Sequence, residues 1–175
     1  MGRLNDSGFW QGGKIEDVRT LKLPGTVYGK GFGLRSIDLS GGVMGGHLGQ
    51  VDPCTYKKAH RHCGGAHIVI VQGSGYALLW EKDFKDRIRF DIKKGTIYCP
   101  PEGWWHLHFN TGTEDMRQVA LRNFEMMGKL YFQRIPMKKG GDLMDYDEEP
   151  PELRKEFEAE LAKNGLKSAM QYKQG

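Results

Sequence analysis

The chain has 175 residues, of which 38% are hydrophobic and 27% are charged. This is the size of one domain with room for a terminal extension, and the apolar content excludes a wholly disordered protein. The net charge of +4 is not gathered in an arginine-rich block, so nucleic acid is not expected as a partner. No apolar run approaches the roughly 18 residues of a membrane span, and the start of the chain has no signal-peptide core. We therefore expect a cytoplasmic protein that does not insert into membranes.

An N-terminal arm, residues 1–19, opens the chain in our prediction. It carries Phe9 and Trp10, two large apolar side chains that need a surface to cover them. We expect a second subunit to offer this surface.

Residues 20–135 are predicted to form short β-strands separated by Gly, Pro and Asp. Residues 87–92 alternate strictly between apolar and charged side chains, as in a half-buried strand. The β-branched run 68–71 is typical of a strand covered on both faces, and Gly73-Ser74-Gly75 predicts that it forms a hairpin with 76–80. The other candidate strands are 95–99, 105–109, 118–122 and 129–134. Short strands at this spacing indicate an all-β fold class, either an antiparallel sandwich or a barrel.

Residues 136–175 are predicted to form a polar, acidic linker over 136–150 and then one helix. Pro151 suits the first helical turn, and Asn164-Gly165 suits a left-handed C-cap. The apolar stripe of the helix, at spacing i, i+4 and i+8, consists of Leu153, Phe157 and Leu161. We expect this stripe to dock the helix on the β-domain. Binding to a partner protein is the alternative.

Five of the six histidines lie in two short segments: His60, His62 and His67 in the first, His106 and His108 in the second. Residues two apart on a strand point to the same face, so each His-x-His pair can converge on one ion. A lone histidine on a strand is usually structural, but two such pairs in a small β-domain are harder to explain that way. The spacing therefore predicts a metal site, with a hydrogen-bonded histidine core as the alternative.

Both histidine segments carry a family resemblance, to the cupin superfamily. The second cupin motif is reproduced at every fixed position by Gly95-x5-Pro101-x-Gly103-x2-His106-x3-Asn110. The first motif is similar to His60-x-His62 followed by Gly73. The resemblance implies a small β-barrel or jelly roll with one metal near its mouth. It does not imply one reaction, because cupins include dioxygenases, isomerases, lyases, decarboxylases, storage proteins and ligand sensors.

The first motif departs from the family pattern at its usual glutamate ligand. Counting back from Gly73 puts this position at Ala66, and the looser spacing puts it at His67. No Asp or Glu occurs from Pro53 to Trp80. The usual ligand carboxylate is therefore absent from this segment.

Two ligand sets remain open at this point. In the first, His60, His62 and His106 form a three-histidine site; in the second, His67 turns inward as a fourth ligand. Strand parity turns His67 outward unless Gly64-Gly65 holds a bulge that resets the alternation.

The three-histidine set resembles that of cysteine dioxygenase and acetylacetone dioxygenase, which implies a mononuclear non-haem iron dioxygenase. Neutral imidazoles leave the ion its full +2 charge, so a small anionic or chelating substrate is expected. A hydroxylated aromatic or an enolisable diketone, cleaved at a C–C bond, fits this description. Fe(II) is the expected metal, and Zn, Ni, Mn and Cu are alternatives. A non-redox lyase, isomerase or hydrolase and a non-catalytic binding protein are the other functions considered, and the family's frequent dimers imply a homodimer.

Further polar residues are candidates for a role beside the metal. His108 should share a face with His106 and is predicted to act as a general base, with core packing as the alternative. Arg117 and Arg122 could recognise an anionic substrate or lie solvated on the surface.

The remaining candidates are expected to be structural. Cys63 and Cys99 are predicted to be buried small residues, although Cys63 could approach the site. The isolated His47 is expected to be structural, and Arg61 should face away from the metal because it alternates with the two histidines.

Overall fold

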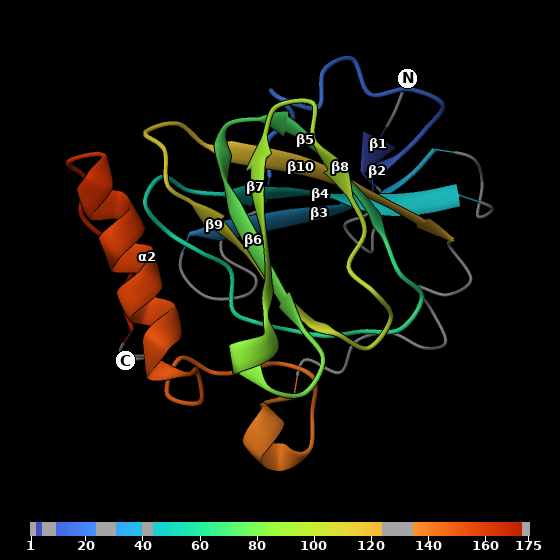
Figure 1. Ribbon diagram of the computed structural model, residues 1–175. Coiled ribbons are helices and arrows are strands. Elements are labelled where there is room, and N and C mark those ends of the chain that lie inside the picture. Colours follow the sequence, from blue (N-terminus) through green and yellow to red (C-terminus); the bar gives the residue numbers. More distant parts are fainter. Residues whose placement is uncertain (1–2, 5–9, 24–30, 40–43, 124–134, 173–175) are drawn as a thin grey trace.

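The part of the chain that this computed structural model describes comprises residues 3–4, 10–23, 31–39, 44–123 and 135–172. It forms two β-sheets that face each other and one α-helix, which covers the outside of the smaller sheet (Figure 1). No helix in these residues is long and apolar enough to cross a membrane.

The larger sheet has seven strands in the order β1-β2-β3-β4-β10-β5-β8. These strands are β1 (Arg3–Leu4), β2 (Trp10–Gln11), β3 (Phe32–Asp38), β4 (Met44–Val51), β10 (Met116–Asn123), β5 (His67–Gln72) and β8 (Ile97–Tyr98). All described pairs are antiparallel except β2 with β3. The last element of this sheet in the sequence, β10, therefore lies at its centre between β4 and β5.

The smaller sheet has three strands in the order β7-β6-β9. They are β7 (Ile88–Lys93), β6 (Ser74–Trp80) and β9 (Trp105–Asn110), and a short 3-10 helix, η1 (Phe84–Asp86), joins the first two along the chain. The free edge of β9 is extended by residues 55–61. Isolated bridges pair Tyr56 with Phe109 and His60 with His106, and Leu143 continues the row beyond His60.

The space between the two sheets is filled by one apolar cluster at one end and by polar side chains at the other. The cluster comprises Phe32, Leu34, Val51, Ala66, Ile68, Ile70, Ile92, Met116, Ala120 and Leu143. The buried polar side chains include His47, Lys57, His60, His106, His108, Gln118 and Arg122. Buried polar groups are costly unless they are paired, so these side chains need partners within the fold.

The outer face of the smaller sheet packs under α2 (Pro151–Lys163). Leu153, Phe157 and Leu161 are all fully buried there, which confirms the predicted apolar stripe. Ion pairs reinforce the contact, since Arg87 lies 2.8 Å from Glu156 and Arg89 lies 3.3 Å from Glu160.

The predicted ends of the helix are also confirmed. Pro151 is its first residue. Gly165 has φ +69° and donates its N–H to the carbonyl of Ala162, while Leu166 donates to Leu161. A left-handed glycine that lets two N–H groups turn back in this way is the Schellman arrangement.

The hairpin predicted around Gly73 is wrong. Strands β5 and β6 lie in different sheets, because β5 pairs with β10 and β8, whereas β6 pairs with β7 and β9. Gly73 has φ +78°, and a Cβ there would lie 2.7 Å from the Cα of Met116. The glycine thus lets the chain cross from one sheet to the other at a point where another strand presses against it.

Most other predicted strands occur within one or two residues of their expected bounds, with two exceptions. The segment 95–99 contributes only the two-residue β8, and 129–134 lies outside the described residues. Within the arm, Phe9 also lies outside the described residues, and Trp10 belongs to β2. The predicted linker, 136–150, holds the 3-10 helix η2 (Met137–Lys139) and the Leu143 bridge to His60.

Candidate metal centre

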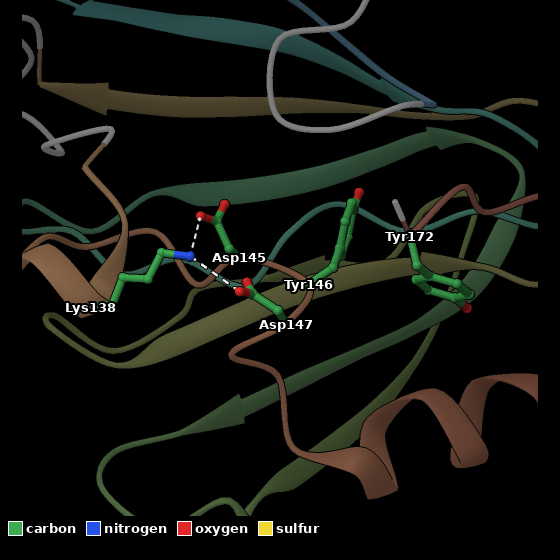
Figure 2. Close-up of a pocket in the computed structure, with 5 residues that line it drawn as sticks. All are labelled: Lys138, Asp145, Tyr146, Asp147 and Tyr172. Atoms are coloured by element: carbon green, nitrogen blue, oxygen red, sulfur yellow. Dashed lines mark hydrogen bonds and ion pairs between the residues drawn. The ribbon is translucent and has the colours of Figure 1, made fainter. Parts of the chain in front are cut away.

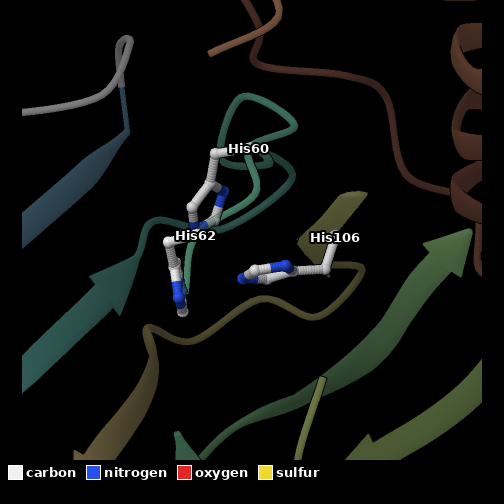
Figure 3. A group of neighbouring side chains, drawn as sticks. All are labelled: His60, His62 and His106. Atoms are coloured by element: carbon white, nitrogen blue, oxygen red, sulfur yellow. The ribbon is translucent and has the colours of Figure 1, made fainter. Parts of the chain in front are cut away.

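Three histidines from the two His-x-His segments lie together between the sheets (Figure 3). One ring nitrogen of each of His60, His62 and His106 lies within 4.8 Å of the others. The ring centres of His60 and His106 are 4.2 Å apart, and those of His62 and His106 are 4.9 Å apart. No acidic side chain belongs to this group, so the donors that it offers are imidazole nitrogens alone.

Backbone carbonyls hold the three rings in the same tautomer. Nδ1 of His60 lies 3.1 Å from the carbonyl oxygen of Lys58, Nδ1 of His106 lies 2.9 Å from that of Trp104, and Nδ1 of His62 lies 3.1 Å from that of Cys63. A carbonyl only accepts, so each Nδ1 carries the proton and each Nε2 carries the lone pair. Metal-ligating histidines are commonly oriented in this way by an acceptor on the far nitrogen.

Burial keeps these imidazoles neutral. The pKa of His60 and that of His106 lie well below the usual value of 6.5, chiefly because burial penalises the charged ring. The pKa of His62 is lowered to about 4, first by burial and next by the charge of Arg122. Neutral rings bind a cation without first losing a proton, so the group is ready for a metal near neutral pH.

A local irregularity brings His60 into line with β9. Between the bridges Tyr56–Phe109 and His60–His106, three residues (57–59) lie on one side of the pair and only two (107–108) lie on β9. This extra residue is a β-bulge, which shifts the alternation of side chains. As a result Tyr56 packs on the outer face, while Lys57 and His60 both reach the interior.

Two cations approach the histidines directly. Nζ of Lys57 lies 2.7 Å from Nε2 of His60, and an Nη of Arg122 lies 3.4 Å from Nε2 of His62. Both side chains are buried. The histidine group is thus contacted by two cationic side chains from inside the fold.

A fourth histidine pairs with a tyrosine across the two sheets. Nδ1 of His108 lies 2.5 Å from the hydroxyl of Tyr98. Burial lowers the pKa of His108 and raises that of Tyr98, so both side chains are neutral. The His108 ring centre is 5.9 Å from that of His106, which places this pair beside the three-histidine group but outside it.

Comparisons with known proteins support the fold. No protein-family model and no curated protein matches the sequence. Among solved structures, a variant of oxalate decarboxylase from Bacillus subtilis has a TM-score of 0.50 at 15% identity, covering 57% of this chain and 28% of that chain. The cupin domain of Cnp3 from Schizosaccharomyces pombe has a TM-score of 0.47 at 14% identity, covering 62% of this chain and 72% of that domain's chain. The chain has the cupin fold.

At these identities the comparisons establish the fold alone. The chain matches only about a quarter of the length of the oxalate decarboxylase structures. What this chain shows of its own is a three-histidine group with the donor chemistry and the tautomers that suit a metal ion.

His67 and His47 lie apart from the group. His67 is exposed at the start of β5, opposite Leu121, whereas its neighbours Ala66 and Ile68 are buried. The glycines before it make a turn without resetting the alternation, so this placement favours the three-histidine set. His47 is buried between the sheets, and its Nδ1 has no hydrogen-bond partner among the described residues.

Two expectations for the cysteines are wrong. Cys63 and Cys99 are both exposed, because each lies outside the strands and next to glycine or proline. Arg61 faces away from the histidines as expected and pairs with Asp142 at 2.9 Å.

The two candidate arginines, Arg117 and Arg122, make contacts in different parts of the structure. Arg117 donates to Gln50 and to the carbonyl oxygens of Val18 and Leu21, so it anchors the N-terminal segment. Arg122 is the arginine that reaches the histidines. Lys57 was not among the residues chosen from the sequence, because strand parity alone turns it away from His60.

A second group of potential ligands consists of Asp145, Asp147 and Glu148. Asp145 and Asp147 line a cavity of about 330 Å³ (Figure 2). Lys138 lies 3.7 Å from Asp145 and 3.1 Å from Asp147, and Lys58 lies 2.7 Å from Asp145. Asp145 and Asp147 are therefore already paired with cations of the chain itself, and Glu148 accepts from the backbone N–H groups of Lys138 and Asp145. The histidine group is therefore the stronger metal candidate.

Proposed function

We propose that this cupin holds one divalent transition metal, Fe(II) in the first place, on Nε2 of His60, His62 and His106. We further propose that it is a mononuclear non-haem iron dioxygenase, which cleaves a C–C bond in a small oxygen-chelating substrate. The observation that carries the proposal is the shared orientation of the three rings, each with Nδ1 bound to a carbonyl. Fe(II) bound there would supply the redox chemistry that lets dioxygen react with an electron-rich substrate.

The surrounding charges support an anionic substrate. Three neutral imidazoles would leave the metal its full positive charge. A phenolate, an enolate or a carboxylate would be attracted by this field. The substrate class is therefore a hydroxylated aromatic or an enolisable diketone.

The pair of His108 and Tyr98 would handle protons beside the metal. Each side chain is neutral and each can donate or accept a hydrogen bond. His108 lies on the same strand as His106 and on the same face. It can therefore take a proton from a bound hydroxyl group while Tyr98 holds the ring in place.

The same pair supports a second candidate function. Proton transfer next to a metal is also the chemistry of a non-redox lyase, isomerase or hydrolase, and Zn²⁺ on three histidines would suit it. The third candidate is a binding protein without catalysis, in which the hydrogen bond between His108 and Tyr98 would only satisfy two buried polar groups.

The first test is the metal content of protein purified without oxygen and without added metal. About one iron per chain, absent from the His106→Ala variant, followed by oxygen uptake with hydroxylated aromatics or diketones, would support the dioxygenase. Zinc or nickel held by the same residues, with no oxygen uptake after iron loading, would favour the non-redox enzyme. A chain that takes up no metal would contradict both functions.

We also propose that the protein is a homodimer, because cupins often dimerise and because the arm brings apolar residues such as Trp10 to the edge of the larger sheet. Light scattering tests this directly. A mass of 19.9 kDa, that of one chain, would contradict it.

A further inference from the structure

Two side chains near the candidate metal centre carry buried polar atoms that have no hydrogen-bond partner among the described residues. These atoms are Nδ1 of His47, on β4, and Oε1 of Gln118, on β10. His47 is 6% exposed and Gln118 is 1% exposed. A polar atom that is buried without a partner costs free energy, so two of them side by side indicate that something is meant to bind there.

The two side chains are neighbours on the inner face of the larger sheet. Across the ladder of β4 and β10, His47 pairs with Ala120 and Gln118 pairs with Gly49. These four positions form a square with the polar residues on one diagonal, and diagonal neighbours lie about 7–8 Å apart. The other diagonal holds only alanine and glycine, so no larger side chain of these strands separates His47 from Gln118.

The pair also lies close to the candidate metal centre. Strand β4 contacts β9 across the interior, where Asn110 donates to the carbonyl oxygen of Val51 at 2.8 Å. Burial lowers the pKa of His47 well below 6.5, and nearby charges that include His62 and His108 lower it further. The His47 ring is therefore neutral and lies near both histidine segments.

A hydroxyl group is the ligand that satisfies both atoms at once. Oε1 of Gln118 only accepts, whereas Nδ1 of a neutral imidazole can carry the ring proton and donate it. A hydroxyl oxygen accepts one hydrogen bond while its proton donates another, so a single O–H group can bridge the two side chains. A carboxylate or a ketone would leave Gln118 without a donor.

We propose that His47 and Gln118 form a hydroxyl-binding subsite, which recognises an O–H group of the substrate that does not bind the metal. This inference deepens the proposed function and rests on it. The substrate would chelate the metal through two oxygens and present a third oxygen, as a hydroxyl group, to the subsite. Aromatic compounds with three hydroxyl groups are thereby favoured over simple catechols and over diketones.

The test compares ligands that bind to the Zn²⁺-loaded protein in the absence of oxygen, by isothermal titration calorimetry. Pyrogallol and hydroxyquinol carry a third hydroxyl group at the two possible types of ring position, and the methylcatechols with the same substitution patterns carry a methyl group there. We expect at least one of the two trihydroxybenzenes to bind about tenfold more tightly than its methyl analogue, which leaves both buried atoms unpaired.

Gln118→Met should reduce this ratio to about one, because it keeps the length of the side chain and removes the acceptor. His47→Phe should do the same by removing the donor. The affinity of the catechol oxygens for the metal is common to each pair of ligands and cancels in the ratio.

Gln50→Met is the matched control. Gln50 lies on the opposite face of β4, and its amide group is paired with Asp52 at 3.0 Å and with Arg117 at 2.9 Å. Its loss should lower the midpoint of urea unfolding and leave the ligand ratio unchanged. Gln118→Met should not lower the midpoint, because it removes an atom that has no partner in the ligand-free protein.

Equal affinities for the hydroxyl and methyl ligands in the wild type would overturn the subsite and leave the metal site standing, whether or not the variants fold. An unchanged ratio in Gln118→Met would do so as well. A loss of stability in Gln118→Met as large as that in Gln50→Met would mean that the pair holds a structural water instead of a substrate group, and would also overturn it. A wild type that binds no Zn²⁺, or that binds Zn²⁺ but none of these ligands, would contradict the proposed function and the subsite together.

Discussion

The two faces of β9 have opposite chemistry although every residue of the strand is buried. Trp105, Leu107 and Phe109 point outward into the apolar cluster beneath α2. His106, His108 and Asn110 point inward, the two histidines to the candidate metal centre. Burial therefore does not distinguish a structural core from a functional site. The distinction comes from what each face meets, a helix on one side and a second sheet on the other.

Burial shifts the pKa values of titratable groups on the two faces in opposite directions. On the inner side it lowers the pKa of His62 to about 4, and on the outer side it raises the pKa of Glu149 to about 8. Both groups are pushed toward their neutral forms. As the pH falls from 6.5 toward 4, the unfolded chain binds a proton at His62 that the metal-free folded protein does not, so stability is lost. As the pH rises from 4.5 toward 8, the unfolded chain releases the proton of Glu149 that the folded protein keeps, so stability is lost there too.

The largest expected effect comes from breaking the inner face. His106→Ala should weaken metal binding about 1000-fold, since a protein zinc site is worth roughly 10–16 kcal/mol and one of three ligands is lost. His67→Ala is the matched control and should leave the affinity unchanged, because His67 is exposed on β5. Chelator competition measures both. A comparable loss in His67→Ala would restore the four-histidine set.

Breaking the outer face should destabilise the protein without altering the metal site. Phe157→Ala removes a fully buried ring of α2 that packs 5.1 Å from Tyr56 and 5.4 Å from Phe109, measured between ring centres. We expect it to lower the free energy of unfolding by about 3–5 kcal/mol. Urea unfolding measures this loss. The folded fraction should keep its metal affinity, and a large change in that affinity would show that the two faces are coupled.

The pH response of the outer face can be removed by one substitution. Oε2 of Glu149 accepts a hydrogen bond of 2.7 Å from the Tyr56 hydroxyl, which the amide oxygen of Gln can also accept. The pKa of Glu149 is 4.5 in the unfolded chain and about 8 in the folded protein, so between these pH values Glu149 holds a proton only in the folded state. The wild type should therefore lose about 3 kcal/mol of stability relative to Glu149→Gln between pH 6 and pH 9. Parallel urea titrations at these two pH values check this. If the difference in stability between the wild type and Glu149→Gln is the same at both pH values, Glu149 is charged in the folded protein.

The smallest expected effect concerns the link between the two sheets at the inner face. Tyr98→Phe removes the hydroxyl that contacts His108 but keeps the ring. We expect a loss of about 1 kcal/mol in the free energy of unfolding and an unchanged metal affinity. In an active enzyme, the pH profile of turnover should shift, because His108 loses its partner. An unchanged profile together with an unchanged stability would show that the pair has no role.

The regular parts of the fold could be predicted because they repeat a local pattern. The apolar stripe of α2, its C-cap and the strands at 68–71 and 105–109 all follow from side-chain spacing. The hairpin at Gly73 could not, since a glycine turn looks the same whether the chain returns to its own sheet or crosses to another. Only the distant strand β10, which pairs with β5, decides between the two.

The candidate site divides in the same way. The sequence by itself determined that His106 and His108 share one face, because the period of a strand is two residues, and that no carboxylate accompanies His60 and His62. The predicted strand through His60 and His62 is wrong, since His60 forms only isolated bridges and His62 lies outside any strand, so their convergence was decided by the tertiary structure. The approach of Lys57, of Arg122 and of the Tyr98 hydroxyl was decided by the tertiary structure. A bulge reverses the direction of Lys57, and the other two side chains come from strands of the opposite sheet. The alternation along one strand is a local property of the backbone, whereas the contents of the space between two sheets depend on how they pack.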